Sequence, residues 1–149
     1  MSSPSFETSS PPECKDCVII FPAEHVVLVT ICRADKMNTT NYALNWYLQD
    51  LWQWFDDEPA LRVAIVTGQG EKAFCAGSDL LEIEASQRNM HMSREYAIPS
   101  GDSAGLSRRV GKKPVLAAVN GLALGGGFEI VLNWYVSTAN LCFADQFVD

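Results

Sequence analysis

The sequence predicts an α/β fold in which buried, mostly parallel strands alternate with helices. Two near-continuous apolar segments, 61–67 and 115–119, are typical of strands covered on both faces of a parallel sheet. Each is followed by a turn of small residues and then by a segment with the periodicity of a helix. Strands that alternate with crossover helices in this way are characteristic of α/β domains.

The longest predicted helix follows residues 39–41, Thr-Thr-Asn, which are residue types that cap helix N-termini. Apolar residues then recur at helical spacing from Leu44 to Phe55, and Pro59 ends the helix. Before this helix we expect strands at 17–21 and 25–32, and after it a strand at 61–67, a helix at 79–92 and a loop at 96–105. The rest of the chain is predicted to form a short helix at 106–111, a strand at 115–119, a turn at 120–127 and a helix at 128–134. Two short strands, at 135–138 and 141–143, follow.

Composition indicates one globular domain. The chain has 149 residues, of which 48% are hydrophobic, and we expect 1–16 to be a disordered arm and 17–149 to be the domain. The net charge of −7 argues against nucleic-acid binding, because no basic block is present to neutralise phosphates. No apolar run is long enough to span a bilayer. The odd, irregularly spaced set of five cysteines and the lack of a secretory signal favour an intracellular location, either cytoplasmic or organellar.

Two segments share one design, in which a buried strand leads through a small-residue turn into a helix. The first continues from its strand into Ala73-Phe-Cys-Ala-Gly-Ser-Asp-Leu80, and the second is Pro114-Val-Leu-Ala-Ala-Val-Asn-Gly-Leu-Ala-Leu-Gly-Gly-Gly-Phe-Glu129. Turns of Gly and Ala let ligand atoms approach the backbone closely. Where such a turn opens a helix, unpaired N–H groups point outward with the positive end of the helix dipole behind them. Two of these N–H groups, one from each turn, could converge on one oxygen and stabilise a thioester enolate.

These two segments resemble the signature segments of the crotonase (enoyl-CoA hydratase/isomerase) superfamily. A third segment, Arg33-Ala-Asp-Lys-Met-Asn38, is similar to the turn of that family that contacts CoA. The resemblance runs from about residue 18 to residue 143, and the segments are in the expected order. It implies a crotonase-like ββα spiral core that lacks the family's C-terminal helices.

The resemblance also implies a role for particular residues. It places the oxyanion donors at the backbone N–H groups of Ser78 and Gly126, and it matches Glu129 to the first of two acidic residues that act on the catalytic water. It implies an acyl-CoA thioester as substrate, with no separate cofactor and no metal, since CoA enters as part of the substrate. The residues expected to contact the substrate are Lys36, Met37, Ala76, Asp79, Leu80 and Gly125.

The sequence departs from the family pattern in two ways. At the position of the family's second catalytic Glu this chain has Phe147, and nearby Asp145 and Asp149 do not fall on the motif. Acid/base action by a pair of carboxylates would be weakened by that change. The family's C-terminal helices, which cover the acyl pocket and build a homo-oligomer of the trimer type, are absent from this chain, so its apolar helices are expected to be partly uncovered.

Several interpretations remain open. Hydration of a 2-enoyl-CoA is the leading hypothesis, an isomerase or another enolate-forming acyl-CoA reaction is the second, and an inactive fragment that binds CoA or a partner is the third. The Gly68-Gln-Gly70 segment has an alternative interpretation as part of a dinucleotide-binding turn, but that turn requires a helix to begin at once. Lys112 and Lys113 are either a solvated turn or a contact for a CoA phosphate.

Overall fold

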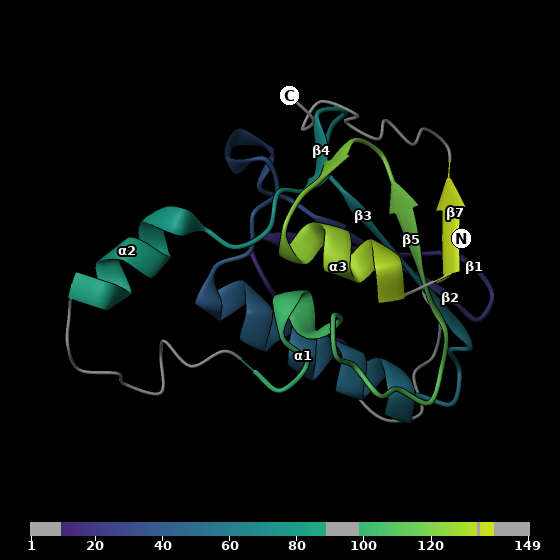
Figure 1. The fold of residues 1–149 in the computed structure, drawn as a ribbon. Helices are drawn as coiled ribbons and strands as arrows, with labels where there is room; N and C mark the ends of the chain where they lie inside the picture. The colour runs from purple at the N-terminus through teal and green to yellow at the C-terminus, as the bar shows by residue number, and fades with distance from the viewer. Residues whose placement is uncertain (1–9, 89–98, 134, 139–149) are drawn as a thin grey trace.

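The computed structural model describes residues 10–88, 99–133 and 135–138. Its main sheet has five strands in the order β1-β2-β3-β5-β7, and a second sheet pairs β4 with β6 (Figure 1). β1 runs antiparallel to β2, and the remaining pairs are parallel. The strands are β1 (Cys17–Ala23), β2 (Val26–Ile31), β3 (Val63–Gly68), β4 (Ala73–Cys75), β5 (Val115–Val119), β6 (Leu122–Ala123) and β7 (Tyr135–Thr138). The helices are η1 (Ala34–Lys36), α1 (Tyr42–Asp57), α2 (Leu80–Arg88), η3 (Ser103–Gly105) and α3 (Gly126–Asn133).

Helix α1 forms as the sequence predicts. Its N-cap is Asn41, whose side-chain oxygen accepts a hydrogen bond of 2.8 Å from the backbone N–H of Leu44. The apolar residues at helical spacing form its buried face, and Trp52 and Phe55 are among the largest fully buried side chains of the core. The helix ends at Asp57, two residues before Pro59.

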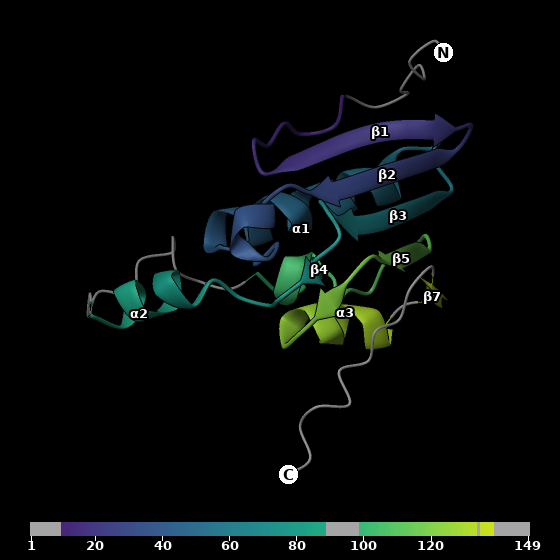
Figure 2. The same cartoon turned by 90° about the horizontal axis from the view of Figure 1, so that it is seen from above.

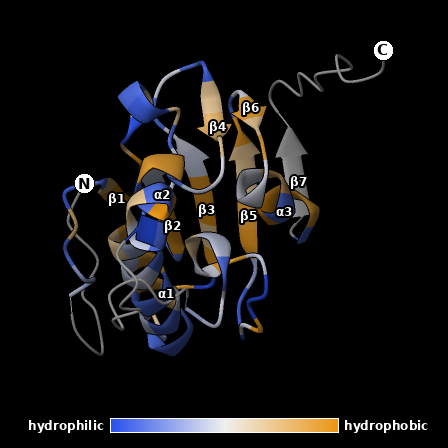
Figure 3. Ribbon diagram, turned by 60° about the vertical axis from the view of Figure 1, so that its left-hand side comes forward, coloured by the Kyte–Doolittle hydropathy of each residue, from blue (hydrophilic) through white to orange (hydrophobic). Residues whose placement is uncertain are grey.

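The helices cover one face of the main sheet. Figures 1 and 2 show α1 and α3 on the same face, whereas α2 projects away from the body of the molecule. Much of β3 and β5 is hydrophobic, and the outer side of α1 is hydrophilic (Figure 3). In β3, buried and half-buried residues alternate, so the expectation that this strand is covered on both faces is wrong. The described helices pack on the side of Ala64 and Val66, which leaves Val63 and Ile65 half-buried.

The structure corrects the short helix predicted at 106–111. The helical turn is the 3-10 segment η3, and residues 106–111 form a turn and irregular backbone. The strands β4 and β6 lie within segments predicted as turns, and α3 begins at Gly126 rather than at residue 128. Helix α2 is described only as far as Arg88, so the predicted continuation to 92 and the strand at 141–143 lie outside the described residues.

The described part of the predicted arm, residues 10–16, contacts the domain. The Tyr47 hydroxyl donates a hydrogen bond of 2.9 Å to the Pro12 carbonyl, and the backbone N–H of Cys32 donates to the Asp16 carbonyl at 2.7 Å. Residues 1–9 lie outside the described part. Among the helices that the structure describes, none combines the length and the apolar character needed to cross a bilayer.

Candidate active site

The two glycine-containing turns identified in the sequence meet in the structure. Strands β4 and β6, which lead into the turns, pair in parallel, and the backbone N–H of Leu124 donates to the Cys75 carbonyl at 3.0 Å. Gly77 has a φ of +89°, and a Cβ at this position would lie 3.0 Å from the Leu124 carbonyl oxygen and 3.3 Å from the Gly126 nitrogen. Only glycine combines that backbone conformation with so close an approach.

The turn at Ser78 has a defined orientation because it pairs with the residue before α1. Thr40 and Ser78 form a parallel bridge, in which the Thr40 N–H donates to the Gly77 carbonyl at 2.8 Å and the Asp79 N–H donates to the Thr40 carbonyl at 2.9 Å. In such a bridge the N–H of the residue between the two bonded groups points away from the partner strand. Accordingly, the Ser78 N–H donates no hydrogen bond to any residue that the structure describes.

The turn at Gly126 opens helix α3. The N–H groups of Gly127 and Phe128 donate to the carbonyls of Leu124 and Gly125, at 2.9 and 3.0 Å. The N–H of Gly126 has no acceptor within the described residues, as expected for the first residue of a helix. Within the described part of the chain, two backbone N–H groups without an acceptor, at Ser78 and Gly126, therefore lie on turns that touch at Gly77.

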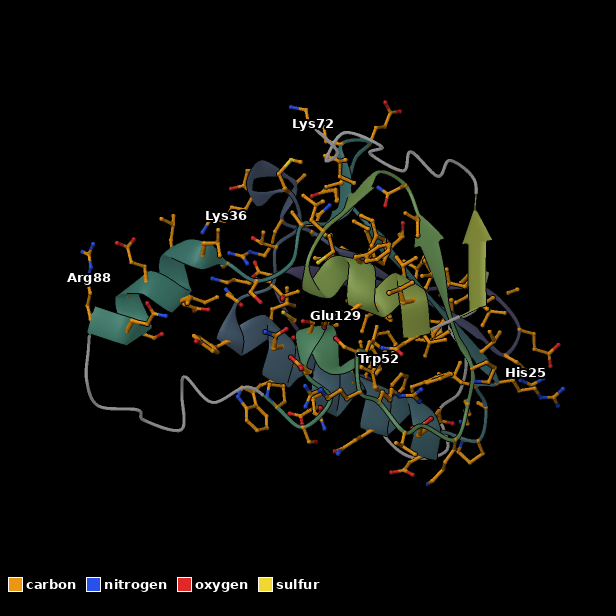
Figure 4. All side chains as sticks on the ribbon, viewed as in Figure 1. His25, Lys36, Trp52, Lys72, Arg88 and Glu129 are labelled. Carbon is orange, nitrogen blue, oxygen red and sulfur yellow. The ribbon has the colours of Figure 1, made fainter. Side chains whose placement is uncertain are left out.

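Glu129 lies in the first turn of α3, where its backbone N–H donates to the Gly125 carbonyl at 3.1 Å. Its side chain is exposed, and Figure 4 shows it on the side of α3 that faces α1 and the η3 turn. The residue thus stands about one helical turn beyond Gly126, where a carboxylate is favoured by the helix dipole.

The predicted CoA-contacting turn is held against the first of these corners. The Ala76 N–H donates to the Met37 carbonyl at 3.0 Å, which places these two predicted contact residues side by side. The Lys36 ammonium lies 3.4 Å from the Asp79 carboxylate and remains half-exposed. Leu80, at the start of α2, is 76% exposed, so it presents an uncovered apolar side chain at the rim of this region.

The side chain of Asp79 is held in a buried ion pair. Its carboxylate accepts a hydrogen bond of 2.8 Å from the Arg33 guanidinium, and both side chains are less than one-tenth exposed. Burial alone would raise the pKa of Asp79, but the Arg33 hydrogen bond and the charges of Lys36 and Arg33 hold that pKa below its usual range. The sequence interpretation gave Asp79 a contact role and missed this ion pair, because the partner lies 46 residues away.

Ser103 is a further residue of the site that the sequence did not identify. A Cβ added to Gly126 would overlap the Ser103 hydroxyl, so this side chain lies directly against the second corner. The turn that carries Ser103 is strained, with φ values of +58° at Asp102 and +53° at Ala104. A tightly held turn of this kind gives no periodic signal in a sequence.

Helix α1 holds the strained turn with three polar side chains on one face. Asn45 accepts a hydrogen bond of 2.8 Å from the Ala104 N–H, and the Trp52 indole donates to the Ala104 carbonyl at 2.8 Å. The Gln49 side chain accepts from the Gly101 N–H at 2.9 Å. Their spacing of four and three residues is that of one helical face.

The surroundings of the glycine, lysine and candidate metal-ligand residues bear on the other interpretations. Gly70 is followed by a turn and then by β4 rather than by a helix, which removes the dinucleotide-binding interpretation. Lys112 pairs with Asp57 at 2.7 Å and Lys113 donates to the Phe55 carbonyl at 2.7 Å, so both cations bind the C-terminal end of α1. Within the described ranges, no three His, Cys, Asp or Glu side chains are grouped as metal ligands would be.

A protein-family comparison agrees with this arrangement. The family model for enoyl-CoA hydratase/isomerase matches residues 22–139. The chain belongs to this family. The matched range includes both glycine-containing corners and the turn at residues 33–38.

Curated relatives include hydratases and dehydratases. The chain is 45% identical over 134 residues to mevalonyl-coenzyme A hydratase sidH of Aspergillus fumigatus, covering 89% of this chain and 48% of that protein. It is 37% identical over 121 residues to carnitinyl-CoA dehydratase of Proteus mirabilis, covering 79% of this chain and 44% of the relative. The chain therefore spans about half the length of the curated relatives it matches.

Solved structures of the family show the same fold. A probable enoyl-CoA hydratase/isomerase from Mycobacterium abscessus aligns with a TM-score of 0.70 and 33% identity, over 85% of this chain and 46% of that one. A carnitinyl-CoA hydratase from Mycobacterium avium aligns with a TM-score of 0.68 and 32% identity, over 83% and 46% of the two chains. The predicted crotonase-like α/β fold is thereby confirmed, as the N-terminal half of that fold.

Proposed function

We propose that the chain binds an acyl-CoA thioester with its carbonyl oxygen between the backbone N–H groups of Ser78 and Gly126, and that it adds water to a 2-enoyl-CoA. The observation that carries this proposal is the contact of the two corners at Gly77, with an N–H on either side that has no acceptor among the described residues. Such donors stabilise the negative charge that develops on the thioester oxygen when a nucleophile attacks the conjugated double bond. Each donor is expected to contribute about 3 kcal/mol to transition-state stabilisation.

Glu129 is the proposed base for the water molecule. Its place one turn into α3 puts its carboxylate on the same helix as the Gly126 donor, so the two groups are fixed relative to each other. The carboxylate orients the water and accepts one of its protons as the oxygen attacks the β-carbon, and the protonated Glu129 then returns that proton to the α-carbon of the thioester enolate. The names of the relatives, a mevalonyl-CoA hydratase and a carnitinyl-CoA dehydratase, support addition and elimination of water as the reaction class.

Absorbance of the conjugated thioester provides the test. The wild-type chain should remove this absorbance from crotonyl-CoA and form 3-hydroxybutanoyl-CoA, whereas Glu129→Gln should lose roughly two orders of magnitude or more in turnover. Glu84→Gln is a matched control, since Glu84 is an exposed carboxylate of α2 that pairs with Arg88 and does not line the site. Absence of turnover by the wild-type chain would refute the hydratase proposal, and equal turnover by Glu129→Gln would remove Glu129 from it.

A second function, binding of CoA thioesters without turnover, is favoured by a specific observation. The resemblance to the family matches Phe147 to the position of that family's second catalytic carboxylate. Binding of butanoyl-CoA, measured calorimetrically, together with unchanged crotonyl-CoA absorbance would favour this function. Migration of the double bond without a hydroxylated product would instead indicate an isomerase.

A further inference from the structure

A small cavity adjoins the first corner. It has a volume of about 150 Å³ and lies among the start of α1, the start of α2 and the turn before η3. Because a water molecule in the liquid occupies about 30 Å³, the cavity has room for about five waters or for a short acyl tail. Its lining residues are Thr40, Tyr42, Asn45, Ser78, Asp79, Glu82, Ile83, Asp102 and Ser103.

Most polar groups of this lining already have partners. Asp79 is paired with Arg33, and Asp102 is paired with Arg108 at 3.2 Å. One carboxylate oxygen of Glu82 accepts a hydrogen bond of 2.6 Å from the backbone N–H at the start of α1. The Asn45 side chain accepts from the backbone of the η3 turn. These groups shape the cavity and are engaged within the protein.

Two hydroxyl groups of the lining make no hydrogen bond with the residues that the structure describes, and one of them is fully buried. The buried one belongs to Thr40, a residue that is 1% exposed. Ser103 is 8% exposed, and its hydroxyl makes no hydrogen bond with the described residues. Buried hydroxyl groups without partners are destabilising and rare in native proteins. The buried, unpaired Thr40 hydroxyl and the Ser103 hydroxyl line the same cavity beside the corner at Ser78, an arrangement expected where a ligand supplies hydrogen bonds.

We propose that this cavity binds a neutral hydroxyl group on the acyl chain of the substrate. A hydroxyl can both donate to and accept from the two serine and threonine oxygens, whereas an acyl carboxylate would be repelled by the acidic residues of the lining. Ser103 makes the first contact because it lies against the Gly126 corner, and Thr40 lies deeper and engages after rotation about its Cα–Cβ bond. This inference rests on the proposed binding of an acyl-CoA thioester.

Four saturated thioesters of equal chain length test it on the wild-type chain: butanoyl-CoA, 4-hydroxybutanoyl-CoA, 4-(trimethylammonio)butanoyl-CoA and succinyl-CoA. None contains a double bond to hydrate, so calorimetry reports binding alone. The hydroxylated thioester should bind roughly three- to tenfold more tightly than butanoyl-CoA, the effect of one or two neutral hydrogen bonds. Equal binding of these two, or tighter binding of the cationic or anionic thioester, would overturn the inference.

Variants assign the effect to the two hydroxyl groups. Ser103→Ala should abolish most of the preference for 4-hydroxybutanoyl-CoA, and Thr40→Val should reduce it. Ser107→Ala is the matched control, because its hydroxyl is buried in the same region but donates to the Ser103 carbonyl and does not line the cavity. A preference that survives both Ser103→Ala and Thr40→Val would overturn the assignment.

The unliganded protein gives a second measurement. Because the Thr40 hydroxyl has no partner, Thr40→Val should keep or raise the melting temperature while it weakens binding of the hydroxylated thioester. A large fall in the melting temperature would show that the hydroxyl serves the fold. The outcomes also separate the two proposals: no binding of any of the four thioesters refutes the acyl-CoA site itself, whereas equal binding refutes only the hydroxyl subsite.

Discussion

The Arg33 guanidinium lies 2.8 Å from the Asp79 carboxylate, and this buried pair joins the turn before α1 to the corner that carries Ser78. Its position explains how two segments 46 residues apart hold one geometry. Arg33 also donates to the Thr39 carbonyl at 2.6 Å, so the pair fixes the backbone that leads into α1.

We expect Arg33→Met to lower the free energy of unfolding by about 3–5 kcal/mol, because it leaves the Asp79 carboxylate buried without its main partner. Urea denaturation followed by circular dichroism measures this loss. Lys112→Gln is the control, since its ion pair with Asp57 is exposed and should contribute little. Similar losses in the two variants would contradict the importance of the buried pair.

The same pair predicts a dependence of stability on pH. The folded-state pKa of Asp79 lies below the value of about 3.9 expected for the unfolded chain, so the unfolded state binds the proton more readily. The stability that Asp79 contributes is therefore present above the unfolded pKa and is lost as the pH falls through the folded pKa. Denaturation measured from pH 6 downward should show a smaller acid dependence in Asp79→Asn than in the wild type.

Gly77→Ala should reduce turnover of crotonyl-CoA by at least tenfold, because the new Cβ would press on the Leu124 carbonyl and separate the two corners. The positive φ adds a backbone penalty of about 1–3 kcal/mol. Gly70→Ala is a matched control. Gly70 has a similar φ of +81°, but a Cβ added there would have its nearest neighbour 3.9 Å away. It should lose similar stability and keep its turnover; equal loss of turnover in the two variants would argue against contact between the corners as the cause.

Asn45→Ala should loosen the strained turn at Asp102 and Ala104, since it removes the acceptor of the buried Ala104 N–H. The expected loss of stability is about 1–3 kcal/mol, the effect of an unsatisfied buried donor. Amide hydrogen exchange should become faster at Ala104 and remain unchanged at Val66 in the centre of β3. Unchanged exchange at Ala104 would mean that Trp52 and Gln49 hold the turn without Asn45.

Exposed apolar side chains of α3 predict binding of a hydrophobic dye. Leu132 is 68% exposed and Phe128 is 40% exposed. The double variant Phe128→Ser, Leu132→Gln should lower dye fluorescence with little change in melting temperature, because surface positions carry little packing energy. Ile130→Ser, on the buried side of the same helix, should instead lower the melting temperature strongly.

Periodic and local features are the parts of the fold that the sequence predicted well. The apolar spacing and Asn41 cap predicted α1, and the two glycine-containing turns predicted the meeting of two corners. The strands β4 and β6 were not predicted, because they have three and two residues and lie in segments rich in turn formers. Short strands take their conformation from their partner rather than from their own propensity.

Features that depend on distant contacts could not be predicted. Ser103 lies against the Gly126 corner because Asn45, Gln49 and Trp52 hold its turn, and no local pattern encodes that relation. The pairing of Asp79 with Arg33 likewise required the fold. The family resemblance assigned Glu129 its role, which stays a prediction; the structure places this residue, exposed, in the first turn of α3.

The Thr40–Ser78 bridge determines which substitutions are expected to be tolerated at residues 77 and 78. The proposed donor at position 78 is a main-chain group whose direction is set by neighbouring peptide bonds, so many side chains are compatible with it. A saturation library selected for acyl-CoA turnover should accept small and medium-sized residues at 78 and almost none at 77. Sequence diversity at position 78 would then show that the side chain there is free to vary, because the proposed hydrogen-bond donor is a backbone N–H group.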